Sequence, residues 1–372
     1  MTSAAERLLP PLQTEDIFKR TKGRVAKVLS AYEKAVGIAQ GHSEAVIKID
    51  KASSGIKTAA HMQAAAEYLS RNGKLELETQ EGESLSLDDV KERINLWCQD
   101  AQVPPVTVDS KRPADARRII LSCPPGTDPK SVYAAAKQLA QEVLKDQGFE
   151  YLMVMHYKNK DHPKEPEHPH VHFLIKAVNE RGVRLNLRKG DLRYIRERFA
   201  VIAKSYGIKL NATPRAVRGQ TLKAKTQAQI HQEQSQAQKW AIKRKKSKLH
   251  PYAEARRNEL ITALKENKPI ADHPALNKSK TTRQQVLKNI DELVKELQNS
   301  EKTENVEIAK KLKEKYTKLP KVESAQQIKL RIAKRKLAEK LQQQNSFKQK
   351  QSQAQKWAIN NKKQAQQNNV DR

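Results

Sequence analysis

Alternating and continuous apolar positions predict five short strands between residues 46 and 178. Successive side chains of a strand point to opposite faces, so an alternating segment indicates a strand with one buried face. The segment 151–156 is apolar almost throughout, as expected for a central strand that is covered on both faces. The predicted strands are 46–49, 74–78, 118–123, 151–156 and 170–178.

Capping residues and helical periodicity predict helices between these strands. Thr58 and Asp128 are N-cap residues, and Pro129 occupies a first helical position that favours proline. The predicted helices are 15–39, 58–71, 87–101, 128–148 and 191–207. Together these elements predict an α/β (α+β) sandwich over about 45–215, with a mostly antiparallel central sheet and flanking helices.

The composition changes after Arg218 and Gly219, where Lys, Gln, Ala and Glu become dominant and strand-forming residues become rare. This composition predicts long, charged helices with disordered stretches. We therefore expect three regions: a helical leader at 1–42, a sandwich domain at 43–220, and a basic helical tail at 221–372.

The tail contains a nine-residue repeat, because the sequence QSQAQKWAI occurs at 234–242 and again at 351–359. The two copies hold Trp240 and Trp357, two of the three tryptophans in the chain. One interpretation is an inert duplication in low-complexity sequence. The other is a docking motif whose tryptophan anchors on a partner or stacks on a nucleic-acid base.

The charge of the chain favours nucleic acid as a partner. The 372 residues carry a formal net charge of +30. Residues 221–372 hold 36 Lys+Arg against 15 Asp+Glu, a difference of +21, and residues 1–220 hold 36 against 27, a difference of +9. The sequence contains no run of about 18 apolar residues, so it predicts no membrane span, and the N-terminal segment does not have the apolar region of a signal peptide. Two cysteines fit a reducing cytoplasm, where we expect the protein to be located.

Five of the ten histidines lie between 156 and 172. His170 and His172 are two residues apart on a predicted strand and therefore share a face, which favours a divalent metal site. For the third ligand we favour His156 at the end of the neighbouring strand, with His162 in the following loop as the alternate. His168 is a further alternate or a supporting residue. The competing interpretation is a group of solvated loop histidines.

A three-histidine metal site in a basic protein indicates phosphodiester chemistry, which also requires a nucleophile. Tyr68 is the candidate, since Arg71 and Lys74 follow it and cations hold phosphates. The competing interpretation is that Tyr68 is a core-packing residue of its helix.

Three ordered motifs are similar to those of relaxases, the nucleases that start conjugative DNA transfer, and especially to the T-DNA border nuclease branch. The first motif surrounds Tyr68, the second runs from Leu121 to Asp128, and the third contains His156, His170 and His172. The downstream signature includes Gly182, Leu185 and Asn186, Asp191 to Arg193, and Arg215, Arg218 and Gly219.

The resemblance implies that Tyr68 attacks a single-stranded DNA phosphate at a transfer origin and becomes linked to the 5′ phosphate. It implies that the three histidines hold a divalent cation, Mg or Mn, and that Arg71, Lys74 and Ser122 contact the DNA backbone. The implied partners are an accessory DNA-binding protein and a type IV secretion coupling protein, with export of the nuclease on the transferred strand.

The sequence departs from the family pattern after the first histidine. The family has an acidic residue two positions later, where this chain has Lys158, and the loop before the histidine pair is longer here. The candidate substitutes for the acidic residue are Asp161, Glu165 and Glu167. One alternative is a noncatalytic basic DNA-binding protein with a degenerate metal site. Another is a rolling-circle replication initiator, although its tyrosine would lie downstream of the histidines.

Overall fold

A computed structural model describes residues 3–9, 27–50, 55–101, 113–160, 165–219, 251–272 and 274–370. The chain divides into two compact units. The first combines Met1–Arg218 with Val286–Leu319, and the second combines Gly219–Gln285 with Pro320–Arg372. Part of the predicted tail therefore packs in the same unit as the sheet.

The first unit contains a six-stranded sheet in the order β2-β5-β7-β6-β3-β4, and every neighbouring pair is antiparallel. This confirms the predicted antiparallel sheet. Separately, the two-residue strands β1 (Ser43–Glu44) and β8 (Leu210–Asn211) pair in parallel. The strands of the main sheet are β2 (Val46–Ile49), β3 (Leu77–Thr79), β4 (Ser84–Leu85), β5 (Ala116–Ser122), β6 (Tyr151–His156) and β7 (His170–Lys176).

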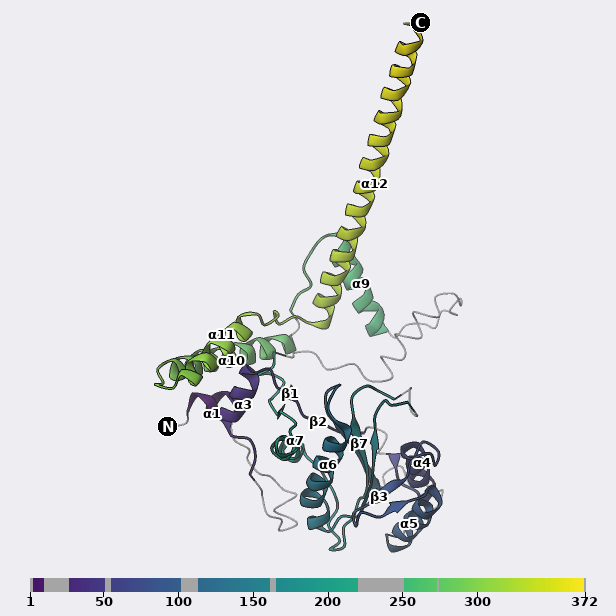
Figure 1. The fold of residues 1–372 in the computed structure, drawn as a ribbon, viewed down its shortest axis with the longest axis vertical. Helices are drawn as coiled ribbons and strands as arrows, with labels where there is room; N and C mark the ends of the chain where they lie inside the picture. The colour runs from purple at the N-terminus through teal and green to yellow at the C-terminus, as the bar shows by residue number, and fades with distance from the viewer. Residues whose placement is uncertain are drawn as a thin grey trace. The chain divides into compact units, whose positions relative to one another are not determined.

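Helices cover both faces of the sheet (Figure 1), which confirms the predicted sandwich. The helices α4 (Ala59–Leu69) and α5 (Leu87–Asp100) pack on one face, where Leu152, Val154 and Leu174 join their core. The helices α6 (Pro129–Val143) and α7 (Lys189–Ser205) pack on the other face with Met153 and Phe173. Alternate residues of β6 and β7 thus enter two different cores, as the period of a strand requires.

The ends of several elements differ from the predicted limits. The strand predicted at 74–78 begins only at Leu77, because Arg71, Asn72 and Gly73 have positive φ angles and form a turn after α4. The helix predicted at 128–148 ends at Val143, and the short 3₁₀ helix η2 (Lys145–Gln147) leads to the left-handed Gly148. Strand β7 ends at Lys176 rather than at 178.

Within the predicted leader, the structure has two short helices, α1 (Ala4–Leu8) and α3 (Ala31–Ala39), while 10–26 lie outside the described residues. The helix α3 begins after Ser30, whose side chain accepts a hydrogen bond from the Glu33 amide. Within the described residues, the helix predicted over 15–39 therefore covers Ala31–Ala39, and its first part, 15–26, lies outside them.

The leader and a tail segment share one hydrophobic core. It joins α1 and α3 to the second half of α10 (Pro274–Gln298) and to α11 (Thr303–Thr317), with Leu8, Ile38, Ile290 and Leu312 all buried. A buried ion pair between Lys34 and Glu197, with Nζ and Oε2 2.6 Å apart, links α3 to α7. The leader is therefore an integral part of the first unit.

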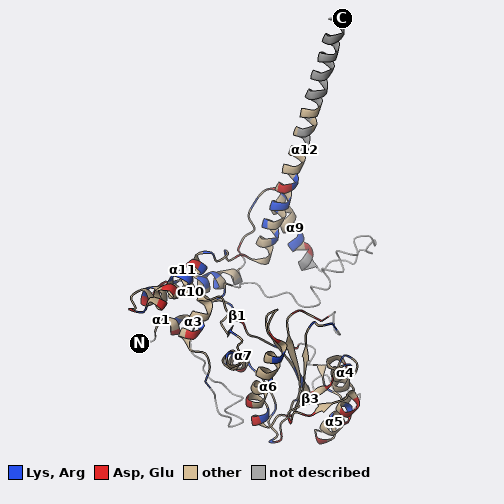
Figure 2. Cartoon of the chain, in the orientation of Figure 1, with Lys and Arg blue, Asp and Glu red and all other residues tan. Residues whose placement is uncertain are grey.

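The second unit is helical, as predicted for the tail, and contains α9 (Pro251–Lys265) and α12 (Ala325–Val370). Ala263, Ile270 and Leu330 form its small core. Basic residues are visible on α9 and on the first turns of α12 (Figure 2). The second repeat copy lies within α12, whereas the first copy lies outside the described residues. Among the helices of the described segments, none is long and apolar enough to cross a membrane.

Candidate functional site

Three buried histidines meet at one end of the two central strands. His170 and His172 share a face of β7, and His156 at the end of β6 lies opposite His170 in the antiparallel register. One ring nitrogen of each residue lies within 4.8 Å of those of the other two. The His168 ring lies 5.3 Å from that of His170 but outside this group, and His162 lies outside the described residues.

Hydrogen bonds determine which nitrogen of two of these rings carries the proton. His156 Nε2 lies 2.8 Å from the Leu69 carbonyl oxygen, which can only accept, so Nε2 is protonated and Nδ1 keeps its lone pair. His170 Nδ1 lies 3.1 Å from the His168 carbonyl oxygen, which leaves Nε2 unprotonated in the neutral ring. His172 Nδ1 is buried and has no hydrogen-bond partner among the described residues.

All three imidazoles favour the neutral state. Burial, together with the neighbouring histidines, Arg71 and Arg118, lowers the pKa of His172 to about 2. Burial, opposed by the hydrogen bond to Leu69, lowers the pKa of His156 to about 4. Burial also lowers the pKa of His170. Neutral imidazoles offer lone pairs, and His172 Nδ1 has no partner among the described residues, so the donor set fits a divalent cation. At His156 Nδ1, a cation would replace the hydrogen bond that Arg71 Nη2 donates at 3.0 Å.

Tyr68 lies beside the histidines on the last turn of α4. Its ring meets that of His172 edge-on, with centroids 6.3 Å apart and an interplanar angle of 87°. The residue is 52% exposed, which argues against the core-packing interpretation. The guanidinium carbons of Arg71 and Arg118 lie 5.1 Å and 5.3 Å from the centroid of the Tyr68 ring.

The turn after α4 directs Arg71 back over the site. Arg71 and Asn72 have φ angles of 54° and 56°, a conformation that is uncommon for residues other than glycine. Hydrogen bonds from the Asn72 amide to the Glu67 carbonyl and from the Leu75 amide to the Ser70 carbonyl, both 2.8 Å, hold the turn. The strained backbone thus places a guanidinium group next to the tyrosine.

Arg71 connects three groups of the site. Its Nη2 lies 3.0 Å from His156 Nδ1 and donates to Glu165 Oε2 at 2.9 Å, while Nε donates to the other carboxylate oxygen. Its Nη1 donates to the Tyr68 carbonyl oxygen at 3.1 Å. The pairing with Glu165 raises the pKa of Arg71.

The remaining predicted residues lie in different surroundings. Of the acidic candidates, Glu165 reaches the site through Arg71, Glu167 pairs with Lys158 at 3.2 Å, and Asp161 lies outside the described residues. Ser122 faces His170 across the β5–β7 pair. Lys74 is exposed at the end of the turn after α4.

Two residues of the site were missed by reasoning from the sequence. Arg118 of β5 contacts the Tyr68 ring, and Asp50 binds the Arg118 guanidinium. The available signal was the period of the strand, since Arg118 alternates with Ile120 and Ser122 on the face that carries the histidines.

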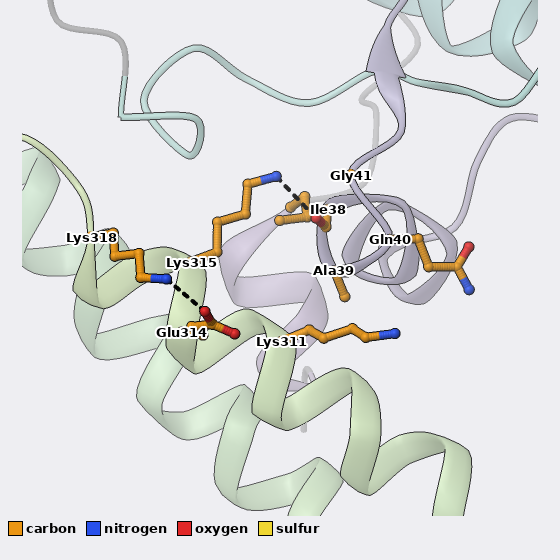
Figure 3. Close-up of a pocket in the computed structure, with 8 residues that line it drawn as sticks. All are labelled: Ile38, Ala39, Gln40, Gly41, Lys311, Glu314, Lys315 and Lys318. Carbon is orange, nitrogen blue, oxygen red and sulfur yellow. Dashed lines mark hydrogen bonds and ion pairs between the residues drawn. The ribbon is translucent and has the colours of Figure 1, made fainter.

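A separate hollow of about 360 Å³ lies between the end of α3 and α11 (Figure 3). Lys315 donates to the Ile38 carbonyl oxygen there, and Lys318 pairs with Glu314. Lys311 pairs with Glu307. Because these ammonium groups are already paired, we assign no site to the hollow.

Comparison with known proteins places the region that holds the site in a class of nucleases. Residues 68–208 match the family described as relaxase, MobA/VirD2-like, nuclease domain. Residues 68–208, which include Tyr68 and all three histidines, therefore form a relaxase nuclease domain of this family. The resemblance inferred from the sequence motifs is confirmed.

Several curated relatives are T-DNA border endonucleases named VirD2. The protein of Agrobacterium fabrum is 27% identical over 238 residues, which cover 59% of this chain and 47% of the relative. The protein of Rhizobium rhizogenes is 30% identical over 201 residues, which cover 49% of this chain and 44% of the relative. The protein of Rhizobium radiobacter is 30% identical over 205 residues, which cover 50% of this chain and 46% of the relative. The matches thus span about half the length of these relatives.

Proposed function

We propose that the chain is a site- and strand-specific relaxase that nicks and religates DNA to start conjugative plasmid transfer. The observation that carries this proposal is the exposed Tyr68 in ring contact with His172, one of three buried histidines whose nitrogens converge. A nucleophile and a metal-binding group side by side are the two parts that phosphodiester transfer requires.

The proposed step is a transesterification. A bond forms between Tyr68 Oη and the phosphorus, and the bond between the phosphorus and the 3′ oxygen breaks. The phenol proton leaves to solvent, and the 3′ oxygen takes up a proton and becomes a free hydroxyl. The product is a 5′-phosphotyrosyl link, and the reverse reaction with a 3′ hydroxyl religates the strand. Covalent capture divides one displacement into two easier steps.

His156, His170 and His172 are the residues that would hold a divalent cation, which when bound polarises a phosphate oxygen. The Leu69 carbonyl fixes the His156 ring through Nε2, and the His168 carbonyl fixes the His170 ring through Nδ1. Between Mg and Mn, a set of three imidazoles favours Mn, because Mg prefers oxygen ligands.

We assign DNA backbone contacts to Arg71, Lys74 and Ser122. Arg71 forms a bidentate pair with Glu165, and the same planar geometry suits a phosphate. A phosphate that reaches the site can replace Glu165 as the partner of Arg71. Ser122 lies next to His170 in the sheet, within the same surface.

The substrate that we propose is single-stranded DNA at a transfer origin. The accessory DNA-binding protein, the secretion coupling protein and export from a bacterial cytoplasm with the transferred strand are parts of the same proposal. The regions 1–42, 43–220 and 221–372 remain our proposed division, although α3 and α11 share a core with each other. The charge of the tail, 36 Lys+Arg against 15 Asp+Glu, supports a role in DNA binding.

The test is covalent adduct formation. Single-stranded oligonucleotides tiled across the source plasmid's origin region are incubated with the full chain and Mn²⁺ or Mg²⁺, then separated on a denaturing gel. We expect a slower protein–DNA band that disappears with Tyr68→Phe or with EDTA. DNA binding by Tyr68→Phe without any adduct from the wild-type chain would instead support a noncatalytic DNA-binding protein.

A further inference from the structure

Arg118 is a largely buried cation in the wall of the proposed active site. Its side chain is 11% exposed, and Nη2 donates to the carboxylate of Asp50. The residue pairs with Leu174 across the β5–β7 ladder, and Leu174 belongs to the core under α4 and α5. Arg118 therefore lies on the face of the sheet that carries the histidines.

The nitrogen Nε of Arg118 is buried and has no acceptor among the described residues. Buried donors are nearly always paired in native proteins, and the flanking Ala116 and Ile120 show that apolar side chains fit this row of the sheet. An apolar residue would serve the core better than a partly unpaired guanidinium group. The position of Arg118 thus requires an explanation other than packing.

The surroundings of Tyr68 supply that explanation. The tyrosine is 52% exposed at the end of a helix, so hydrophobic packing holds its ring only weakly. Arg71 from the turn after α4 and Arg118 from the sheet both lie within cation–π distance of the ring. His172 meets the ring edge-on. The orientation of the ring is therefore set by these three side chains.

The two arginines differ in how firmly they are held. The Arg71 side chain is 25% exposed and pairs with Glu165. The Arg118 side chain is 11% exposed and pairs with Asp50, the residue that follows β2. Arg71 is the arginine that can change partners when DNA arrives. Arg118 then remains as the fixed contact on the sheet side of the ring.

We infer that Arg118, anchored by Asp50, is a positioning residue that holds Tyr68 in the orientation for attack on the phosphate. The inference rests on the proposed function, since it assigns a role relative to the proposed nucleophile. Displacing a reacting group by about 1 Å lowers a rate on the order of 100-fold, so the loss should appear in the chemical step. Lysine cannot replace a planar guanidinium group that stacks on a ring.

The experiment measures three quantities for the full chain: the single-turnover rate of adduct formation at saturating oligonucleotide, the Kd for that oligonucleotide, and the melting temperature. The variants are Arg118→Gln, Arg118→Lys and Asp50→Asn. The matched control is Arg117→Gln, because Arg117 is the adjacent arginine of the same strand and pairs with Ile175 in the opposite core.

We expect Arg118→Gln to lower the rate by about 10- to 100-fold while Kd changes by less than about threefold. Arg118→Lys should not restore the rate, Asp50→Asn should show a smaller loss of rate, and Arg117→Gln should match the wild type. This separation of rate from affinity would not follow from a merely structural role.

A wild-type rate for Arg118→Gln, or a loss confined to Kd, overturns the inference. If Arg118→Gln does not fold, wild-type rates for both Arg118→Lys and Asp50→Asn overturn it. A wild-type chain that forms no adduct on any origin strand overturns the proposed function itself, and this inference with it. The two failures are therefore distinguishable from the wild-type result alone.

Discussion

The buried histidines make the stability of the fold depend on pH. In the folded chain the pKa of His156 is about 4 and that of His172 is about 2, both below the value of about 6.5 for an unfolded histidine. Between pH 6.5 and pH 4 the unfolded chain therefore binds protons that the folded chain does not. Their stabilising contribution is present above pH 6.5 and decreases as the pH falls through this window.

The size of the effect follows from the number of protons. Each histidine that is protonated only in the unfolded chain changes the free energy of unfolding by about 1.4 kcal/mol per pH unit. His156 and His172 together contribute a slope of up to about 3 kcal/mol per pH unit in the lower part of the window. His172→Asn removes one titrating group, so its slope should be smaller by about 1.4 kcal/mol per pH unit.

The assay is urea unfolding of the full chain at pH 7.5, 6.0, 5.5 and 5.0, with EDTA present to exclude bound metal. His61→Asn is the control, since His61 lies at the start of α4 away from the group of three. We expect the wild type and His61→Asn to lose stability in parallel and His172→Asn to lose it less steeply. Equal slopes for the wild type and His172→Asn would refute the assignment of a buried, neutral His172.

Three further predictions follow from two ion pairs and from the charge of the tail. Lys34→Met leaves the buried Glu197 without its Lys34 partner and should destabilise the first unit by about 3 kcal/mol, measured by urea unfolding; an unchanged midpoint would contradict the buried pair. Glu165→Gln removes the ion pair with Arg71, worth about 1 kcal/mol, that a phosphate would have to break, so it should tighten binding of single-stranded DNA roughly fivefold. An unchanged Kd would show that Arg71 makes no phosphate contact. Deleting 320–372, which holds 13 Lys+Arg and 3 Asp+Glu, should flatten the salt dependence of DNA binding and leave adduct formation intact.

Sequence patterns predicted the parts of the fold that depend on local periodicity. Strands β2 and β6 have the predicted limits, because alternation or a continuous apolar run marks both ends. The contact between His156 and His170 followed from the expectation that the two neighbouring strands pair. The core shared by α3 and α11 could not be predicted, since it joins segments more than 250 residues apart with no pattern linking them.

The same limit applies inside the site. Strand periodicity shows that Arg118 and the histidines lie on one face of the sheet. The contact of Arg118 with Tyr68, however, depends on how α4 crosses that face. The left-handed backbone conformation of Arg71 and Asn72 could not be predicted from the sequence either, because glycine is the residue that normally indicates this conformation. The contacts of Arg71 and Arg118 with the Tyr68 ring therefore required the three-dimensional structure.

The departure at Lys158 has a structural counterpart in the loop before the histidine pair. Lys158 pairs with Glu167, so the position that is acidic in the family faces a carboxylate here instead of supplying one. The longer loop brings Glu165 to Arg71, and Arg71 contacts His156 Nδ1. Glu165 also lowers the net positive charge beside the three neutral imidazoles. We therefore propose that Glu165 takes the place of the missing acidic residue by holding Arg71 against His156 Nδ1 until a phosphate and a cation replace these contacts.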